Sequence, residues 1–198
     1  MKKLLITGFE PFGGQKINPS WEAVTRLPDI IGDFTLIRRQ IPVEYGTAGL
    51  RVKAEAAALS ADAVLMVGQA GGRTDVCCEV VGVNIRNGKI PDNAGYLARL
   101  EPIEADGPAA FFSTLLPDKA FIQRLRNRGL HVDFSCSAGS FICNEVLYSM
   151  LRAAEGTDMK VGFIHVPFLP EQAAPGVPCL SMEEMLQILE AVIGQLSQ

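Results

Sequence analysis

The sequence predicts an α/β fold: a single-domain, three-layer α/β/α sandwich with a mostly parallel twisted sheet and an antiparallel hairpin appended to it. Short apolar and β-branched runs alternate with longer segments of helical composition, which is typical of parallel βαβ architecture. The run at 63–67 is apolar throughout and is stopped by Gly68, as expected for a strand covered on both faces. No linker, repeat, low-complexity tract or charge block interrupts the 198 residues, so we expect one domain over 1–198.

The expected strands are apolar runs bounded by glycine or polar residues. The stretch 76–85 is rich in β-branched residues and punctuated by glycine, and Asn87-Gly88 is a favoured hairpin turn. We therefore expect 76–85 to form the antiparallel hairpin. The strands of the main sheet are expected at 3–8, 34–43, 63–67, 130–136 and 160–166.

Capping residues and apolar spacing mark the expected helices. Asn18 is a favourable cap ahead of Pro19, which suits a first helical turn, and Gly129 ends a helix expected at 118–128. Ser181 and Glu184 form a capping box before the last helix. The apolar stripe of that helix is Met185, Leu189, Val192 and Leu196, and further helices are expected at 47–59, 108–116 and 143–154.

The composition is that of an ordinary globular protein and excludes several classes. Hydrophobic residues make up 48% and charged residues 20%, so a chain of this length can bury a core without metal or disulfides. The net charge of −4 predicts neither nucleic acid nor an anionic membrane as a partner, and no apolar run approaches the roughly 18 residues of a membrane span. The start of the chain lacks the apolar length of a signal peptide, and five cysteines without a C-x-x-C pair predict free thiols. We therefore expect a cytoplasmic protein.

Glycine-rich and polar segments follow several of the expected strands. Ligands of open α/β sheets bind beyond the carboxyl ends of the strands, so we expect the site among these segments, at one edge of the sheet. Neither of two candidates is a phosphate loop: Gly14-Gln15 stands where Lys and Ser or Thr are required, and 68–73 does not fit G-x-G-x-x-G. The segments are 8–14, 68–73, 137–144 and 162–167.

Cys143 is the most informative thiol. It stands where a loop gives way to an expected helix, and the dipole and unpaired N–H groups of a helix N-terminus lower the pKa of a cysteine. A small buried cysteine that packs the helix would show the same spacing. The other thiols are expected to be structural in the case of Cys77 and Cys78, in the core for Cys136, and on a surface loop for Cys179.

The chain has only two histidines, which narrows the choice of a base. His165 ends an expected central strand at the edge where ligands bind, whereas His131 begins a strand at the opposite edge and is expected at the surface. A Cys–His pair needs a third group to orient the imidazole. Glu79 is a candidate, although a solvent-facing strand carboxylate gives the same pattern, and spacing leaves Asp75 and Asp92 open as well.

Seven segments together resemble the pyroglutamyl-peptidase I family, cysteine peptidases also called pyrrolidone-carboxylate peptidases. They stand in the family's order, at 7–14, 18–20, 68–73, 84–85, 90–93, 137–144 and 162–167. The resemblance implies a triad of Cys143, His165 and Glu79, and it is what raises Glu79 above its rivals. It also implies an α/β/α sandwich, no cofactor and frequent homotetramers. The implied reaction is hydrolysis of the amide bond after an N-terminal pyroglutamyl residue, which releases 5-oxoproline through a thioester.

The pyroglutamyl ring is a neutral lactam, so its pocket should be apolar with a few amide-type partners. Backbone N–H groups near Cys143, helped by the loop 71–73, are expected to stabilise the oxyanion. The expected substrate contacts are apolar from Phe9, Phe12, Ile90, Phe141 and Ile142, and polar from the side chain or adjacent backbone of Asn18 or Gln69.

The chain departs from the family pattern near the expected site. Val80 and Lys89 stand where arginine is common, Glu145 stands where histidine is common, and Cys77-Cys78 is an unusual pair. The loss of two guanidinium groups motivates an alternative, an impaired homologue that binds 5-oxoproline or blocked peptides without turnover. Two further alternatives are a redox or metal protein that uses the adjacent cysteines, and an amidase that acts on other lactams or N-blocked peptides.

Overall fold

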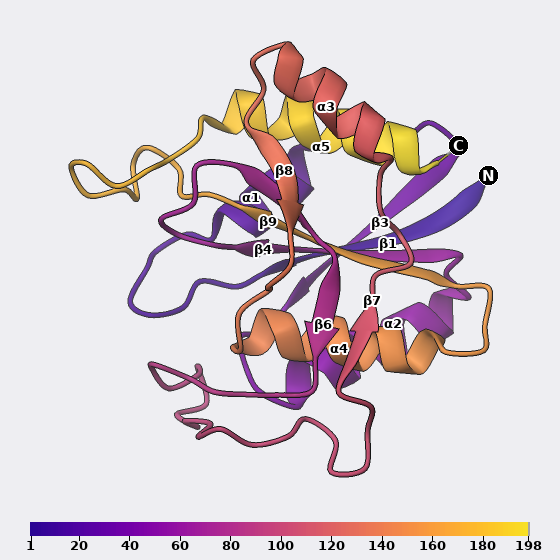
Figure 1. The fold of residues 1–198 in the computed structure, drawn as a ribbon, viewed down its shortest axis with the longest axis vertical. Helices are drawn as coiled ribbons and strands as arrows, with labels where there is room; N and C mark the ends of the chain where they lie inside the picture. The colour runs from indigo at the N-terminus through magenta and orange to yellow at the C-terminus, as the bar shows by residue number, and fades with distance from the viewer. Residues whose placement is uncertain (198) are drawn as a thin grey trace.

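The structure, a computed structural model, describes residues 1–197 and is built on a seven-stranded sheet (Figure 1). The strands are β1 (Lys2–Phe9), β2 (Ile30–Ile31), β3 (Phe34–Ile41), β4 (Ala63–Gln69), β5 (Val76–Glu79), β8 (Val132–Ser135) and β9 (Lys160–Val166). Their order is β2-β3-β1-β4-β9-β5-β8. The pairs β3–β1, β1–β4, β4–β9 and β5–β8 are parallel, whereas β2–β3 and β5–β9 are antiparallel. The prediction of a mostly parallel sheet is confirmed.

Helices cover both faces of this sheet, which confirms the predicted three-layer sandwich (Figure 1). One face carries α1 (Pro19–Arg26), α3 (Lys119–Asn127) and α5 (Met182–Leu196), and the other carries α2 (Thr47–Leu59) and α4 (Ile142–Ala154). Each face has its own buried apolar cluster, so both layers are held by a hydrophobic core. No helix within residues 1–197 has the length and apolarity to span a bilayer.

The predicted caps are present. The Asn18 side chain accepts the N–H of Ser20 at 3.1 Å at the start of α1, with Pro19 as the first helical residue. The Ser181 hydroxyl accepts the N–H of Glu184 at 3.2 Å at the start of α5. These bonds satisfy donors that a helix N-terminus otherwise leaves unpaired, and such caps typically contribute about 1 kcal/mol each.

Alternation along β9 decides which way His165 points. Successive strand residues face opposite sides of a sheet. Ile164 and Val166 belong to the core under α1 and α5, while Val161 and Phe163 belong to the core under α2 and α4. His165 therefore faces the layer that contains α4.

The predicted hairpin at 76–85 is wrong. The first half, β5, enters the main sheet between β9 and β8, and the chain then leaves it. The second half, β6 (Val81–Val83), pairs with β7 (Ala110–Phe112) in a separate two-stranded antiparallel sheet beside α4. Gly82 packs so tightly on α4 that a Cβ there would lie 2.9 Å from the backbone nitrogen of Tyr148. Asn87-Gly88 accordingly lies in the long connection from β6 to β7 and not in a hairpin turn.

The helix predicted at 108–116 is also wrong, because β7 occupies part of this segment. Phe111 and Phe112 have high β propensity, and the segment extends the pairing of β6. Beyond it, the N–H groups of Thr114 and Leu115 both donate to the Val161 carbonyl at 2.9 Å. Tertiary pairing thus overrides the helical composition of the segment.

Cys136 was expected in the core of a strand, and this expectation is wrong. The strand β8 ends at Ser135, and Cys136 is exposed in the segment that leads to α4. Cys179 is exposed, as predicted, and Cys78 is buried in the core.

Candidate active site

The candidate site lies on the α4 side of the sheet, where β4 and β9 end. Because β8 runs opposite to β9, its carboxyl end does not share their edge as the sequence suggested. The connection 136–141 instead leads from the end of β8 to the start of α4. Cys143 arrives at the site as the second residue of that helix.

His165 and Glu79 form the polar centre of the site. In the antiparallel ladder, His165 is opposite Cys77, and Glu79 is opposite Phe163 two residues along. The two side chains therefore share a face, and His165 Nδ1 lies 2.7 Å from Glu79 Oε1. The side chains of His165 and Glu79 are 4% and 0% exposed. The carboxylate accepts the Nδ1 proton, which leaves Nε2 of the neutral ring as the basic atom.

The two rival carboxylates are engaged elsewhere. Asp92 accepts the backbone N–H groups of Tyr45, Ala94 and Tyr96 at 2.8–3.0 Å. Asp75 accepts the hydroxyl of Thr74 at 2.9 Å. Glu79 is thus the one of the three candidates that contacts the imidazole.

Gly68 brings Cys143 next to His165. It pairs with His165 in the parallel ladder of β4 and β9. A Cβ atom on Gly68 would lie 3.0 Å from the Cys143 sulfur and 2.7 Å from Cζ of Phe163. The Phe163 ring in turn packs on the His165 ring, with centroids 4.8 Å apart. The thiol and the imidazole therefore lie on the same face around one glycine, whose missing side chain makes room for both.

The environment of the three groups favours uncharged His165 and Cys143. Burial lowers the pKa of His165, and Glu79 opposes this shift. Burial alone would raise the pKa of Glu79, but hydrogen bonds from His165 and other donors bring it below its ordinary value. Burial, helped by the charge of Glu79, raises the pKa of the Cys143 thiol.

The last shift contradicts the expectation of a lowered Cys143 pKa at a helix N-terminus. Removal of the thiolate from water outweighs the effect of the helix end, although Cys143 keeps partial exposure. Both shifts favour a neutral thiol and a neutral imidazole in the resting pair.

Backbone N–H groups are available where an oxyanion would form. Phe141 is the N-cap of α4, and no side chain caps this helix. The first N–H groups of a helix have no intrahelical acceptor, so those at Ile142 and Cys143 are directed out of the helix end.

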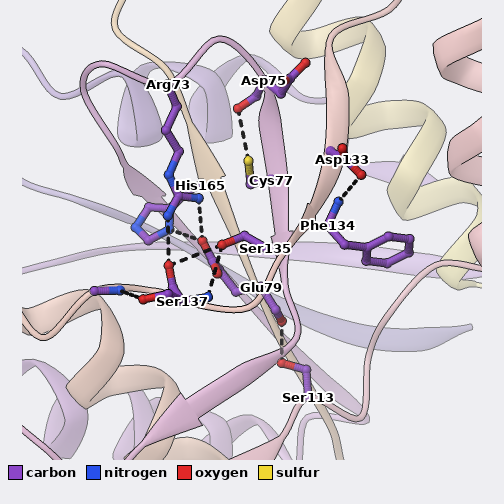
Figure 2. A network of polar contacts seen from close by, with 11 residues as sticks. Arg73, Asp75, Cys77, Glu79, Ser113, Asp133, Phe134, Ser135, Ser137 and His165 are labelled. Carbon is purple, nitrogen blue, oxygen red and sulfur yellow. Dashed lines mark hydrogen bonds and ion pairs between the residues drawn. The ribbon is translucent and has the colours of Figure 1, made fainter.

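Arg73 is the residue of this site that the sequence analysis missed. It was considered only as part of a loop that could help an oxyanion. Its Nη1 donates to Glu79 Oε1 at 2.7 Å, and its Nη2 donates to the Ser137 carbonyl at 2.8 Å (Figure 2). The buried carboxylate therefore contacts a guanidinium group, although the position next to it, where arginine is common in the family, is Val80 in this chain. The one signal in the sequence for Arg73 was its position in the segment that follows a strand.

Three of the seven expected substrate contacts cluster near the start of α4. The Phe12 and Phe141 rings have centroids 6.0 Å apart. Ile90 is 42% exposed, and its Cδ1 lies 3.4 Å from where a Cβ of Gly13 would be. Tyr45, which the sequence analysis did not single out, packs edge-on against Phe141 at 5.4 Å.

The other four expected contacts have evident structural roles. Phe9 packs on Phe163 in the core, and Ile142 is 1% exposed. The Asn18 side chain caps α1 and donates to the Glu10 carbonyl at 2.9 Å, which uses its polar atoms internally. Gln69 accepts a bond from Gln172 at 3.3 Å but keeps partial exposure at the end of β4. Of these four, Gln69 alone retains a side chain that can turn to a ligand.

Glu145 is linked through Arg86 to Tyr45, the ring that packs against Phe141. It is buried, accepts the N–H of Gly46 at 2.7 Å and lies 3.5 Å from Arg86, whose guanidinium sits over the Tyr45 ring. The histidine common at this position in the family is therefore replaced by a carboxylate with its own partners.

The adjacent cysteines face opposite sides of the sheet. Cys78 lies in the core under α1 and α5, so Cys77, its neighbour along the strand, faces the other side. Within the described part of the chain, no three His, Cys, Asp or Glu side chains are grouped as metal ligands.

Comparisons with known proteins agree over the whole chain. The family model of pyroglutamyl peptidases, Peptidase_C15, matches residues 2–198. A pyrrolidone-carboxylate peptidase of Escherichia fergusonii is 45% identical over 98% of this chain and 92% of its own, and one of Levilactobacillus brevis is 46% identical over 96% and 95%.

Two solved structures of the same kind superpose closely. Pyroglutamyl peptidase I of Bacillus amyloliquefaciens has a TM-score of 0.93 at 33% identity, covering 100% of this chain and 97% of its own. Pyrrolidone carboxyl peptidase of Thermococcus litoralis has a TM-score of 0.91 at 35% identity, covering 100% and 93%. With its motifs, its sandwich fold and the matched length in agreement, this chain belongs to the pyroglutamyl peptidase family.

Proposed function

We propose that Cys143, His165 and Glu79 carry the pyroglutamyl peptidase activity of this chain, with Cys143 as nucleophile, His165 as general base and acid, and Glu79 as the group that orients the imidazole. The observation that carries this proposal is the buried 2.7 Å contact between Glu79 and His165, on the face to which α4 presents Cys143. Among the chemistries that use a thiol and an imidazole, acyl transfer fits this order of groups.

The reaction follows from the protonation states. Nε2 of neutral His165 takes the thiol proton as the Cys143 sulfur attacks the carbonyl carbon of the pyroglutamyl amide. The N–H groups at the start of α4 stabilise the oxyanion. Protonated His165 then gives its proton to the leaving amine as the C–N bond breaks, which leaves a thioester. His165 deprotonates a water that attacks the thioester, and 5-oxoproline leaves as the sulfur regains a proton.

The resting pKa values favour this concerted use of the base over a preformed ion pair. Imidazolium develops only when the sulfur attacks, and Glu79 then becomes most stabilising because it accepts the Nδ1 proton of a charged ring. Stabilisation that grows towards the transition state accelerates the reaction, whereas equal stabilisation of the resting state does not.

For substrate binding, we propose that Phe12, Ile90 and Phe141, with Tyr45 behind Phe141, contact the apolar edge of the lactam ring. Gln69 is the proposed amide-type partner. A pocket of this kind rejects an ordinary charged amino terminus, since an ammonium group would lose its water without gaining a paired charge. An unmatched buried polar group costs about 1–3 kcal/mol.

The impaired-homologue alternative rested on Val80 and Lys89. The relatives give this alternative no support. Its argument was the loss of guanidinium groups near the site, and the guanidinium of Arg73 on Glu79 weakens that argument. Binding of 5-oxoproline without turnover would favour it over the proposed activity. An amidase for other lactams is separated from it by a panel of blocked dipeptide amides, of which the pyroglutamyl amide should be hydrolysed fastest.

The deciding experiment is hydrolysis of a pyroglutamyl chromogenic amide by the wild type and by Cys143→Ser. The variant should lose turnover, while Cys78→Ser, in the opposite core, should keep it. Undiminished turnover in a folded Cys143→Ser protein would refute the assignment.

We also propose that the chain is one peptidase domain over 1–198 and that it forms a homo-oligomer, a tetramer being the expected state. Exposed apolar side chains, including Leu100 and Phe112, each 73% exposed, support an association surface. A cytoplasmic location is supported by five cysteines without a disulfide among them. Analytical ultracentrifugation tests the assembly, and a monomer at micromolar concentration would contradict it.

A further inference from the structure

The Glu79 carboxylate binds two cationic or potentially cationic groups through one oxygen. His165 Nδ1 and Arg73 Nη1 each lie 2.7 Å from Glu79 Oε1, while Oε2 has no hydrogen-bond partner in the described chain. Figure 2 shows the arginine approaching Glu79 from the same side as the imidazole. The two donors therefore compete for the charge of a single atom.

The second arm of Arg73 leads towards the nucleophile. Its Nη2 donates to the Ser137 carbonyl at 2.8 Å. Ser137 lies in the connection 136–141, whose end is the N-cap of α4. One planar fork thus joins the segment after β4, the carboxylate on β5 and the chain that delivers Cys143. Lysine lacks this two-armed geometry.

The charges around His165 are few. The titratable groups near it are Glu79 and Cys77 on β5, Cys143 on α4, and Arg73. Burial raises the pKa of both thiols, so they are uncharged at neutral pH. Glu79 and Arg73 are the charged neighbours, and they act on His165 in opposite directions: Glu79 raises its pKa and Arg73 lowers it.

We propose that Arg73 is a positioning residue for the reaction: it holds the Glu79 carboxylate against His165 and ties this pair to the segment leading to Cys143. Its positive charge beside the shared oxygen also opposes protonation of the imidazole. The proposal rests on the proposed function for its kinetic consequences only. Arg73 does not touch the reacting atoms. Its role is exerted through the oxygen that it shares with His165 and through the Ser137 carbonyl.

The direct test is an NMR titration of the imidazole nitrogens in 15N-labelled protein, which needs no substrate. The chain has two histidines, and His165→Gln assigns them. In Arg73→Met, the midpoint of His165 should rise by about one pH unit, because a nearby positive charge is removed. His131, whose side chain is 55% exposed and paired with Glu184, serves as the internal reference. An unchanged His165 midpoint overturns the proposal.

The kinetic test separates charge from geometry. Arg73→Met should move the acidic limb of the kcat/KM profile to higher pH, in step with the NMR midpoint. Arg73→Lys keeps the charge but not the fork, so its acidic limb should stay in place while kcat falls about 10- to 100-fold at little change in KM. Arg26→Met, which removes an exposed ion pair on α1, is the matched control and should change neither.

Further variants keep the test decisive. If Arg73→Met does not fold, Arg73→Gln, which is neutral but can still donate to Ser137, takes its place with the same expected shift. In a Glu79→Gln background, Arg73→Met should cause no further loss of kcat, since the shared carboxylate is already gone. A fall in kcat in both backgrounds, with His165 unshifted, would show a merely structural role. If pyroglutamyl amides are not hydrolysed at all, the proposed function fails and the NMR result still decides this one.

Discussion

Glu79 and His165 contact each other at 2.7 Å across the one antiparallel pairing of β5 with β9, with almost no exposure of either side chain. The pair is offset by two residues along the ladder: His165 lies opposite Cys77, and Glu79 opposite Phe163. The reversal of β5 and β8 relative to β9 in a mostly parallel sheet is what delivers a carboxylate from the neighbouring strand to Nδ1.

Glu79→Gln tests the charge of this pair while it preserves the shape of the side chain. The imidazolium formed during the attack loses its counter-charge, and the amide permits the wrong tautomer. We expect kcat/KM to fall by roughly 10²- to 10⁴-fold, as for orienting carboxylates in comparable triads. The acidic limb of the profile should move to lower pH, since Glu79 raises the pKa of His165. Wild-type turnover in this variant would contradict the role of Glu79.

Glu145 provides a second buried carboxylate with the opposite response to pH. Burial raises its pKa above the ordinary 4.5, so its ionisation opposes folding. This cost is absent below pH 4.5, develops as pH rises through that value and is complete above the folded pKa. Glu145→Gln can still accept the Gly46 N–H. The melting temperature of this variant minus that of the wild type should therefore increase as pH rises.

Glu79→Gln is the control for this measurement, because the pKa of Glu79 is lowered in the folded state. Its ionised form contributes stability above the unfolded pKa, and that stability is lost as pH falls through the folded pKa. The melting temperature of Glu79→Gln should lie below that of the wild type at neutral pH and approach it in acid. Parallel pH trends for the two variants would contradict both assignments.

Gly68→Ala tests the close approach of Cys143 to the sheet. The new methyl group would lie 2.7 Å from Phe163 and 3.0 Å from the Cys143 sulfur, so both must shift. We expect a loss of about 1–3 kcal/mol in the free energy of unfolding, together with a large loss of turnover. Gly194→Ala is the control: its methyl group would meet nothing closer than 3.8 Å, and alanine favours helix α5. An active, stable Gly68→Ala protein would show that the site has room to spare.

Phe141 and Phe9 separate binding from packing. Phe141 is half-buried beside Phe12 and Tyr45, so Phe141→Ala should raise KM about tenfold for a pyroglutamyl amide with a smaller change in kcat. Phe9 is 2% exposed in the core, and Phe9→Ala should instead lower unfolding free energy by about 3–5 kcal/mol. Thermal melts and steady-state kinetics on both variants distinguish these outcomes. A raised KM in a fully stable Phe9→Ala protein would show that Phe9 contacts the substrate.

The layers and helix caps were predictable because they depend on local patterns. Asn18 and Ser181 cap the helices that the sequence indicated, and the apolar runs became the central strands. The split of 76–85 was not predictable, because it depends on the pairing of β6 with β7, a strand that begins at Ala110. Composition favoured a helix there, and long-range pairing decided otherwise.

The site shows the same division. Cys143 and His165 stood out by their places at chain boundaries, whereas Glu79 needed the family resemblance, since its contact with His165 joins residues 86 positions apart. Arg73 reaches across 64 residues to Ser137, a distance that no local pattern encodes. The desolvation of Cys143 could not be predicted from the sequence either, because it depends on the groups that surround the sulfur and not on the helix that carries it.

That desolvation changes the expected alkylation behaviour. A lowered pKa, as the helix N-terminus suggested, would make Cys143 the first thiol that one equivalent of iodoacetamide labels. With the pKa of Cys143 raised, we expect the exposed Cys136 and Cys179 to react ahead of it at neutral pH, and Cys143 labelling to accelerate as pH rises. Peptide mapping by mass spectrometry measures the order.

The Glu79→Gln variant distinguishes a neutral resting pair from a thiolate–imidazolium pair. The negative charge of Glu79 raises the pKa of Cys143, so its removal should speed labelling of Cys143 even as it slows turnover. A resting thiolate–imidazolium pair predicts the reverse, because loss of Glu79 would deprive the imidazolium of its counter-ion and return the proton to sulfur. Slower labelling in Glu79→Gln, or labelling of Cys143 first in the wild type, would therefore establish the ion pair and refute the neutral resting state.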